Sequence, residues 1–476
     1  MTGAAFSIGV VAVHAAKILT FACASRMARL PAMVARLTLA LPLSHRNSHM
    51  NTSRLSPLSF RPLALATLLA LLLPAHAQRY GGGAAQAAPE VKEQKAEQQG
   101  LREEVGKPLL AAEALVKEKK FDEAMAKIDD AEKVANRTEY ENYFILRLRA
   151  TTALSSGKDA LAVQSLMKAY AMPQMPAADK GKIADAITRI NYKLKDYKTA
   201  ATWAATALKE GGGSDLRLIQ GHALYLTEDY PAAQREIAEF LSESEKSGKT
   251  PPEEQYRLLA GIATKLKDDA GYVAVLEKLV VSYPKREYWN DLIVRTEVKK
   301  GFSDRLVLDM YRLKLELGLL TSTGDFLEMA NYVLNQLGYP AEAKKVIDAG
   351  IDAGALSKDS TNDKYRKLMA AINKELAEEK ARAAKNTPIP NTSVARLNNG
   401  YDLVIKGETQ RGLDMMAEGL KLPDLKRPEE ARLRYGIAHV LAGQKDKASE
   451  IFRTINGPDG LTEAARLWDF YARKKS

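Results

Sequence analysis

Few side chains in the second part of this sequence are of the types that do chemistry. Four of the six histidines and the single cysteine, Cys23, lie before residue 78, which leaves His222 and His439. Disulfides, Cys-ligated zinc and a cysteine nucleophile are therefore excluded from residues 78–476. Two histidines so far apart do not favour a zinc site or a serine triad. We expect His439 to be packed in its apolar segment and His222 to be an ordinary polar helix residue.

Other motifs with chemical potential have simpler interpretations. The carboxylate pairs Asp129–Asp130 and Asp268–Asp269 fall where helices are expected to end, so solvated surface is their expected role instead of acid/base catalysis. The glycines at 211–213 are not followed by Lys-Ser or Lys-Thr, as a phosphate-binding loop requires. We therefore expect a protein that is not an enzyme and that has no cofactor and no metal.

The basic charge is concentrated at the beginning of the chain. The formal net charge is +11, but residues 1–77 carry seven basic and no acidic side chains, and the remainder has 63 basic and 59 acidic residues. A nucleic-acid partner would require a clustered basic face with interleaved aromatic residues, and residues 78–476 show none. Aromatic residues make up only 7% of the chain, and the abundance of Ala, Leu, Glu, Lys and Arg favours helices.

The helices must be held by a repeated turn. Five segments combine a short polar turn with a following small residue, and they lie at 119–124, 157–162, 195–200, 228–233 and 338–343. The key alanines of the first four are 38, 38 and 33 residues apart, and less strict copies occur at 407–412 and 443–448. A small residue in each helix allows close backbone approach, and a single helix pair cannot bury its apolar stripe alone. Stacked antiparallel helix pairs are therefore expected.

These segments resemble tetratricopeptide (TPR) repeats. The match is clearest around Gly221 and Ala233, with Leu224, Tyr230 and Ile237 in the family's positions. Another unit runs through Leu259, Ala260, Ala263, Leu276 and Leu279 to Pro284, after which Trp289 stands where a new unit would open. Gly400 and Gly436 fall at the small position of the last two units. The resemblance implies an all-α, right-handed superhelical solenoid of about nine or ten helix pairs.

Departures from the repeat suggest domain boundaries. We expect a TPR-like solenoid at 108–356, a charged helix and linker at 357–393, and C-terminal TPR-like repeats at 394–476 that end in a capping helix with Thr462 as N-cap. Residues 301–320 are helical but lack a clear TPR turn. The charged helix, at 364–384, has no partner in the pattern, and Pro388 and Pro390 follow it.

The N-terminal segment has the features of a targeting signal. Residues 50–77 have the features of a secretory signal peptide, with Arg54 and Arg61, an apolar run at 62–73, and Ala75-His76-Ala77 before a cleavage site. Residues 78–107 read as a flexible linker. Residues 1–49 are either an over-extended N-terminus or an inner-membrane anchor at 4–24. We expect a periplasmic protein whose mature chain has no stable membrane span.

The resemblance implies a scaffold that binds partner peptides or helices of the cell envelope in a concave groove lined by first helices. The repeat register places ten residues there: Arg147, Thr151, Asp185, Arg189, Tyr192, Leu218, His222, Tyr225, Arg257 and Lys265. The surplus of Arg and Tyr suits acidic ligands. Two alternatives remain open, which are an envelope enzyme with a superhelical body, similar to lytic murein glycosidases, and a subunit of an outer-membrane or polysaccharide-export machine.

Overall fold

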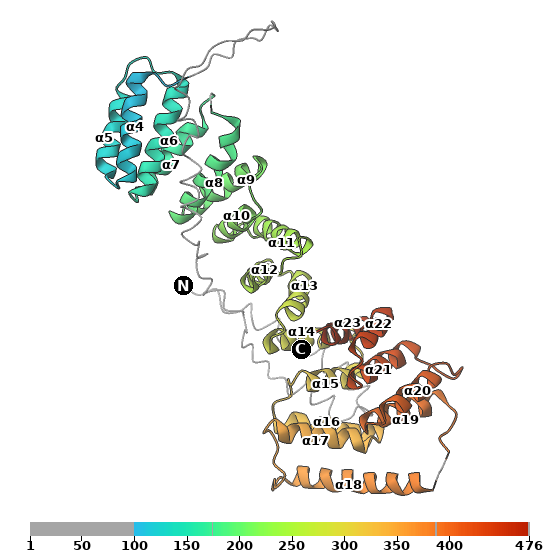
Figure 1. The fold of residues 1–476 in the computed structure, drawn as a ribbon. Helices are drawn as coiled ribbons and strands as arrows, with labels where there is room; N and C mark the ends of the chain where they lie inside the picture. The colour runs from blue at the N-terminus through green and yellow to red at the C-terminus, as the bar shows by residue number, and fades with distance from the viewer. Residues whose placement is uncertain (1–99, 174, 386–387, 475–476) are drawn as a thin grey trace, which may run out of the picture. The chain divides into compact units, whose positions relative to one another are not determined.

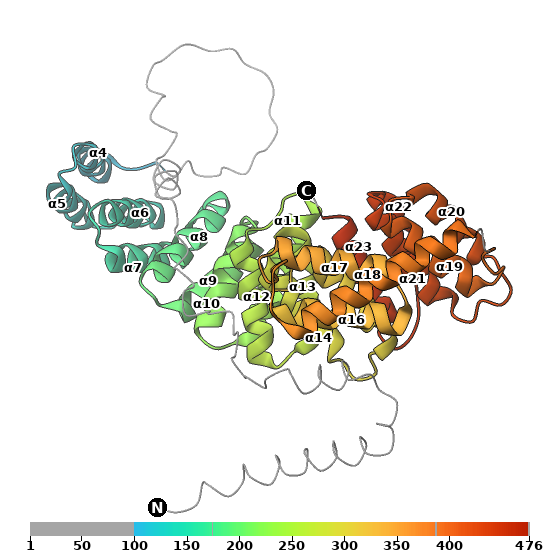
Figure 2. The ribbon, with the colours of Figure 1, turned by 90° about the horizontal axis from the view of Figure 1, so that it is seen from below.

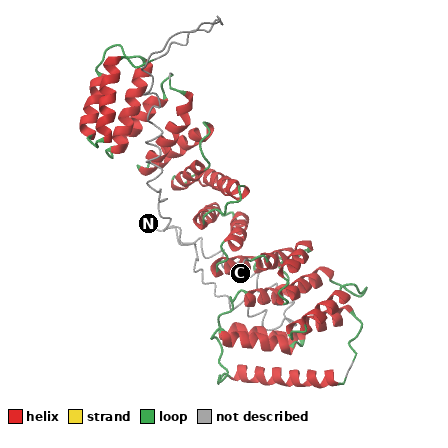
Figure 3. Ribbon diagram, in the orientation of Figure 1, coloured by secondary structure: helices red, strands yellow, loops and turns green. Residues whose placement is uncertain are grey.

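A computed structural model describes residues 100–173, 175–385 and 388–474 of the chain. In these ranges there are twenty α-helices, one short 3-10 helix and no strand (Figure 3), so the predicted all-α fold class is confirmed. None of the described helices is both long and apolar enough to span a bilayer. The predicted signal peptide at 50–77, residues 1–49 and most of the linker at 78–107 lie outside the described residues.

The chain divides into two compact units, and the division falls between Val275 and Leu276, inside one helix. We call residues 100–275 the N-terminal unit and residues 276–474 the C-terminal unit. The helices of the N-terminal unit (Figure 1) are α4 (Glu103–Lys117), α5 (Phe121–Glu132), α6 (Glu139–Ser155), α7 (Asp159–Tyr170), α8 (Ala177–Lys193), α9 (Tyr197–Lys209), α10 (Asp215–Leu226), α11 (Tyr230–Lys246) and α12 (Glu253–Leu266), and α13 (Asp269–Ser282) contains the division.

Successive helices of the N-terminal unit pack against one another as antiparallel neighbours (Figure 2). The interior is built from small and branched side chains, such as Ala124 with Ile128 on α5 and Ala162 with Leu166 on α7, all of which are inaccessible to solvent. Separate apolar clusters lie between consecutive helix pairs, as expected when each pair buries its stripe only against its neighbours.

The first helix starts earlier than the sequence suggested. α4 begins at Glu103, inside the segment assigned to the linker, and Pro108 lies within the helix. The first turn is anchored because Val105 is fully buried and Arg102 binds the buried carboxylate of Glu141 through its backbone and its guanidinium, at 3.1 and 2.8 Å. These contacts compensate for the hydrogen bond that the proline removes.

Eight helix pairs are joined by the same turn. One residue between the two helices has a positive φ, and these residues are Lys119, Gly157, Lys195, Glu228, Lys267, Gly338, Gly407 and Gly443. In all but the pair at Gly338, the next backbone N–H donates to the carbonyl five residues earlier, as Asp196 does to Asn191 at 2.9 Å. This bond is the mark of a Schellman motif, which ends the first helix and turns the chain into the second. The predicted turns therefore share one geometry, except that the turn at 338–343 has the positive φ without this bond.

Small residues mark the closest helix contacts. The residues five positions after the positive-φ residue include Ala124, Ala162, Ala200, Ala233, Ala343 and Ala448, and all six are fully buried. A second set of small residues lies seven positions before the positive-φ residue. There, a Cβ added to Gly436 would lie 2.4 Å from Cε1 of Phe452, and one added to Gly221 would lie 2.6 Å from Cδ1 of Ile237. The small positions identified from the sequence are thus required by packing.

The C-terminal unit contains less regular pairs. Its helices are α14 (Arg286–Glu297), the 3-10 helix η3 (Asp304–Leu306), α15 (Val307–Glu316), α16 (Thr323–Leu337), α17 (Pro340–Asp352), α18 (Asp363–Ala384), α19 (Ser393–Ile405), α20 (Thr409–Gly419), α21 (Pro428–Leu441), α22 (Lys445–Thr454) and α23 (Leu461–Ala472). Residues 301–320 hold only η3 and α15. Gly318 at the end of α15 has a positive φ, and the next N–H, of Leu319, donates to the carbonyl of Lys314 at 2.8 Å, but the next helix, α16, begins only at Thr323. The pairs that share the repeated turn number eight in the described residues, α4/α5 to α12/α13, α16/α17, α19/α20 and α21/α22, against the nine or ten expected.

The charged helix α18 does have packing partners. It spans nearly the predicted range, and Tyr365, Leu368 and Ile372 pack into the apolar cluster of α16 and α17. Beyond Leu376 its side chains are mostly exposed. The unit 276–474 contains both this helix and the repeats at 394–474.

The last helix, α23, closes the C-terminal unit on itself. It packs against α22 and α21 on one side and against α14 and α15 on the other. The backbone N–H of Ser303 donates to the carbonyl of Asp459 at 2.9 Å, just before α23. The predicted N-cap is wrong by two residues, because the helix begins after Gly460, whose φ of 86° a non-glycine residue would adopt only with strain. Thr462 instead accepts a bond from the backbone N–H of Gly457.

Candidate functional site

All ten predicted groove residues lie on first helices of the N-terminal unit, where the first helix is the one that precedes the repeated turn. Arg147 and Thr151 are on α6; Asp185, Arg189 and Tyr192 are on α8; Leu218, His222 and Tyr225 are on α10; Arg257 and Lys265 are on α12. We call the surface that these side chains follow the first-helix face. Its members differ strongly in burial and in charge compensation.

Arg147 is buried and not an open cation. Only 8% of the residue is exposed, and its Nη1 lies 3.1 Å from Oδ2 of Asp179 at the start of α8. The same carboxylate oxygen accepts the hydroxyl of Tyr143 at 2.6 Å, and the guanidinium carbon lies 5.6 Å from the Tyr143 ring centre. Thr151, also buried, donates to the carbonyl of Arg147. Arg147 and Tyr143 therefore join α6 to α8, whereas the Thr151 bond stays within α6.

The positive charge of Arg189 is neutralised by two carboxylates. Its Nε lies 2.5 Å from Asp185 on the same helix, and its Nη2 lies 2.5 Å from Asp215 at the start of α10. Burial raises the pKa of the Asp185 carboxyl, and the neighbouring Arg189 opposes that rise. The surplus positive charge predicted for the groove is therefore largely neutralised at α6 and α8, because the acidic partners come from the next first helix in the stack.

Aromatic rings connect α8 to α11. The Tyr192 hydroxyl hydrogen-bonds Nδ1 of His222, and the two ring centres are 5.7 Å apart. His222 in turn stacks on Tyr225 at 6.5 Å, and Tyr225 lies 5.8 Å from Tyr230 on α11. His222 is buried, and burial lowers its pKa, so the imidazole is neutral at pH 7. His222 is thus a packed bridge between repeats, more buried than the polar helix residue that we expected.

On α12, the basic side chains of the first-helix face have no acidic partner in the described residues. In the described residues, Arg257 has no hydrogen bond or ion pair, and the Lys265 ammonium lies 6.0 Å from the Tyr230 ring centre without a carboxylate partner. Arg257 is half-buried, Lys265 is exposed, and Leu218 on α10 is half-buried. This is the part of the predicted set that could attract an acidic group.

Sequence reasoning missed a cavity at the other end of the same face. A hollow of about 340 Å³ is lined by Glu113, Val116, Lys117, Lys119, Phe121, Leu148, Thr151 and Ser155, from α4, α5 and α6. Only Thr151 among these was predicted. Counting each residue from the positive-φ turn would have aligned Val116 with Tyr192 and Thr151 with His222, and it would have shown shorter side chains at this junction.

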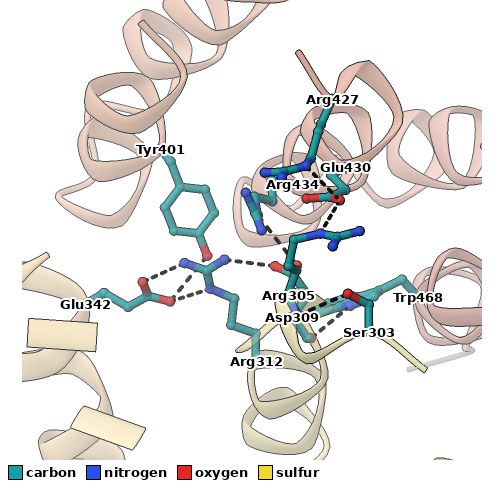
Figure 4. A network of polar contacts seen from close by, with 10 residues as sticks. All are labelled: Ser303, Arg305, Asp309, Arg312, Glu342, Tyr401, Arg427, Glu430, Arg434 and Trp468. Carbon is teal, nitrogen blue, oxygen red and sulfur yellow. Dashed lines mark hydrogen bonds and ion pairs between the residues drawn. The ribbon is translucent and has the colours of Figure 1, made fainter. Parts of the chain in front are cut away.

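The largest group of buried charges belongs to the C-terminal unit (Figure 4). Arg312 on α15 binds both oxygens of Glu342 on α17, at 2.6 and 2.8 Å, and Oδ1 of Asp309 at 3.0 Å. Its guanidinium carbon lies 4.3 Å from the ring centre of Tyr401 on α19. Burial lowers the pKa of Arg312, but the attraction of Glu342 outweighs this and holds the pKa well above its ordinary value.

This network is closely packed. The cavity beside Arg312 and Tyr401 has a volume of only about 10 Å³. The other oxygen of Asp309 lies 3.5 Å from Nε of Arg434 on α21, and the backbone carbonyl of Asp309 accepts the indole N–H of Trp468 on α23. The cluster therefore ties five helices of the unit together and leaves no room for a ligand.

His439 is a packed histidine, as predicted, because it is 2% exposed and its Nδ1 lies 2.8 Å from Oε1 of Gln444. No group of three or more potential metal-ligating side chains is found in the described residues.

Searches of known proteins place the chain in no family. No protein-family model matches the sequence, and no curated protein matches it.

Proposed function

We propose that this protein is an exported scaffold that binds partner proteins, in which TPR-like helix pairs stack into a right-handed superhelix and present the first-helix face to a peptide or helix. The observation that supports this most is the recurrence of a positive-φ turn in eight helix pairs, seven of them with the same backbone hydrogen bond, together with small buried residues at the contact positions of most pairs. Such a stack has no separate catalytic domain in its architecture and offers an extended surface for a partner.

The proposed partner is a protein of the cell envelope. Export is supported by the signal-peptide pattern at 50–77 with cleavage after Ala77, which would place the mature protein in the periplasm. We propose no enzymatic activity and no cofactor, since packed ion pairs account for the charged groups of the first-helix face on α6 and α8 as links between helices.

Arg257 is the residue of choice for testing the surface. Reversing Arg189 would place a carboxylate against Asp185 and Asp215, so loss of binding would be confounded with unfolding. Arg257→Glu changes an uncompensated charge instead. Lys249→Glu is the matched control, because Lys249 is exposed in the loop before α12 and has no ion pair in the described residues.

Crosslinking in intact cells, followed by purification of the tagged chain and mass spectrometry, measures partner capture. We expect one or more envelope proteins with the wild type and with Lys249→Glu, and clearly less with Arg257→Glu at unchanged thermal stability. N-terminal sequencing of the same material should give Gln78 as the first residue. Equal capture by the two variants would reject the α12 surface, and no specific partner in any sample would reject the scaffold.

A further inference from the structure

Two junctions between neighbouring repeats use the same two register positions. The second helix of a repeat is the one that follows the repeated turn. Its first residue contacts a residue on the first helix of the next repeat, and that residue lies two positions before the positive-φ residue. At the junction of α6/α7 with α8, Asp159 and Lys193 form an ion pair of 2.6 Å at these positions. At the junction of α10/α11 with α12, Tyr230 and Lys265 meet at 6.0 Å. The space between first helices is thus occupied by side chains of the chain itself.

A second pair of positions fills the same space from α8 to α10. Tyr192 lies three positions before its turn, His222 lies six positions before the next one, and the two side chains are hydrogen-bonded to each other. Tyr192 also packs edge-on against Tyr197, the first residue of α9, with ring centres 5.5 Å apart. At this junction, therefore, three rings occupy the gap between repeats.

The first junction has short side chains at these positions. Val116 stands where Tyr192 stands, Thr151 where His222 stands, and Ser155 where Lys193 and Lys265 stand, while Phe121 supplies a ring equivalent to Tyr197. The cavity of about 340 Å³ described above occupies this gap, and we call it the first-junction pocket. Its volume lies within the range of small-ligand sites, about 300–1,000 Å³.

The wall of the first-junction pocket offers a ligand mostly carbon atoms and few free hydrogen-bonding groups. Val116, Phe121 and Leu148 contribute carbon atoms, and the hydroxyls of Thr151 and Ser155 already donate to the carbonyls of Arg147 and Thr151, at 3.1 and 2.9 Å. A polar ligand group would find few open partners there. A flat apolar ring, such as those that fill the equivalent gap between α8 and α10, would bury its faces against these carbons.

The rim of the pocket is basic. Lys117 and Lys119 are exposed, and neither forms an ion pair in the described residues, whereas Glu113 is the only acidic lining residue. Neighbouring lysines differ, because Lys120 pairs with Glu118 and Lys158 pairs with Asp122. Two uncompensated cations at the mouth favour a ligand that carries carboxylates next to its apolar group.

We propose that the first-junction pocket receives one aromatic side chain from an acidic segment of the partner protein, in the place that Tyr192 and His222 occupy between α8 and α10. This proposal rests on the proposed scaffold function and specifies where and by what chemistry the first-helix face makes contact. The aromatic group anchors the segment, and Lys117 and Lys119 attract its flanking carboxylates.

A fluorescein-labelled short peptide with a central Trp flanked by Glu residues serves as the probe, and fluorescence anisotropy with the whole chain measures its binding. We expect saturable binding that falls by at least about tenfold when the Trp is replaced by Ala, and again when the Glu residues are replaced by Lys. Ser155→Trp, which fills the pocket, should cause a similar loss. Thr202→Trp is the matched control, because Thr202 is exposed on α9 and its hydroxyl, like that of Ser155, donates to the carbonyl four residues earlier.

Circular dichroism and thermal melting establish that both variants fold. Equal affinity for the Trp and Ala peptides, or unchanged binding by a folded Ser155→Trp protein, would overturn the proposal. Self-association of the wild type that Ser155→Trp abolishes would also overturn it, because the pocket would then hold a second copy of the chain. The peptide titration needs no cellular partner, so a negative result here and a failure of partner capture in cells are separate outcomes.

Discussion

The indole N–H of Trp468 donates to the backbone carbonyl of Asp309 across 159 positions of sequence, at 3.1 Å. The Asp309 side chain binds Arg312, which in turn binds Glu342. One residue therefore connects the last helix of the C-terminal unit to its central ion-pair network. In a row of helix pairs that contact only their neighbours, such a long-range link would be absent. The C-terminal unit is consequently a closed arrangement of helices.

Removal of Arg312 should destabilise this unit strongly. Arg312→Leu leaves the buried carboxylate of Glu342 without its cation, and we expect a loss of about 3–5 kcal/mol in the free energy of unfolding. The double variant Arg312→Leu/Glu342→Leu should recover part of it, since no unpaired charge remains at that position. Urea unfolding followed by the fluorescence of Trp289 and Trp468 measures the effect. Arg366→Leu, which removes an exposed ion pair with Asp363, should change little.

Gly436 should not tolerate even a methyl group. The added Cβ would lie 2.4 Å from Cε1 of Phe452, which is itself buried against Trp468. We expect Gly436→Ala to cost about 1–3 kcal/mol in unfolding free energy from overpacking. Gly106→Ala is a useful contrast, because the nearest atom to its new Cβ is 3.8 Å away and the residue lies inside α4. That variant should gain stability, and a loss for it would contradict the packing argument.

The positive-φ position of the repeated turn should prefer glycine. Lys195 has a φ of 64°, which costs an L-residue about 1–2 kcal/mol, although the greater freedom of glycine in the unfolded chain offsets part of this. We therefore expect Lys195→Gly to raise the melting temperature and Gly157→Lys to lower it. Thermal unfolding followed by the fluorescence of Trp203, in the N-terminal unit, reads out both changes. If both variants melted below the wild type, the turn would not be limited by backbone strain.

Asp402 should make the C-terminal unit more stable at mildly acidic pH. Burial raises the pKa of Asp402 to about 6, with Lys406 opposing and Glu379 reinforcing the rise. Since the folded-state pKa exceeds the ordinary value of 3.8, the folded protein takes up a proton as the pH falls from about 6 to 4. This contribution to stability is present at low pH and is lost as the pH rises through about 6.

The comparison of wild type with Asp402→Asn isolates the effect of this site, because carboxylates distant from Asp402 titrate equally in both. We expect the melting temperature of the wild type, relative to that of the variant, to increase between pH 7 and pH 5. A constant difference across this range would show that Asp402 does not titrate there.

The local features of the fold were predictable, because they depend on neighbouring residues. The turn segments, the buried alanines such as Ala162 and Ala233, and the small sites Gly400 and Gly436 follow from patterns within one helix pair. The range of α18 was also close, since Asn362 caps its start and prolines follow its end. These signals lie within a few residues of the structure that they specify.

The ion pairs between residues distant in sequence were not predictable. Arg147 and Arg189 looked like open cations because their partners, Asp179 and Asp215, lie 32 and 26 positions away on the next first helix. The Arg312 network was missed for the same reason, since Glu342 and Tyr401 are distant in sequence. The first-junction pocket was missed because it shows only when Val116 and Thr151 are compared with Tyr192 and His222 at equal distances from their turns.

The return of α23 to α14 and α15 has a mechanical consequence. Tension applied to the residues after α23 would first load the contacts that hold this helix, among them the Trp468–Asp309 hydrogen bond and the Lys299–Glu463 ion pair. The chain that leads back into α22 would come under load only after these contacts and the packing of α23 against α22 and α21 had broken. The last helix, α23, therefore protects the preceding helix pairs from a pull on this end of the chain.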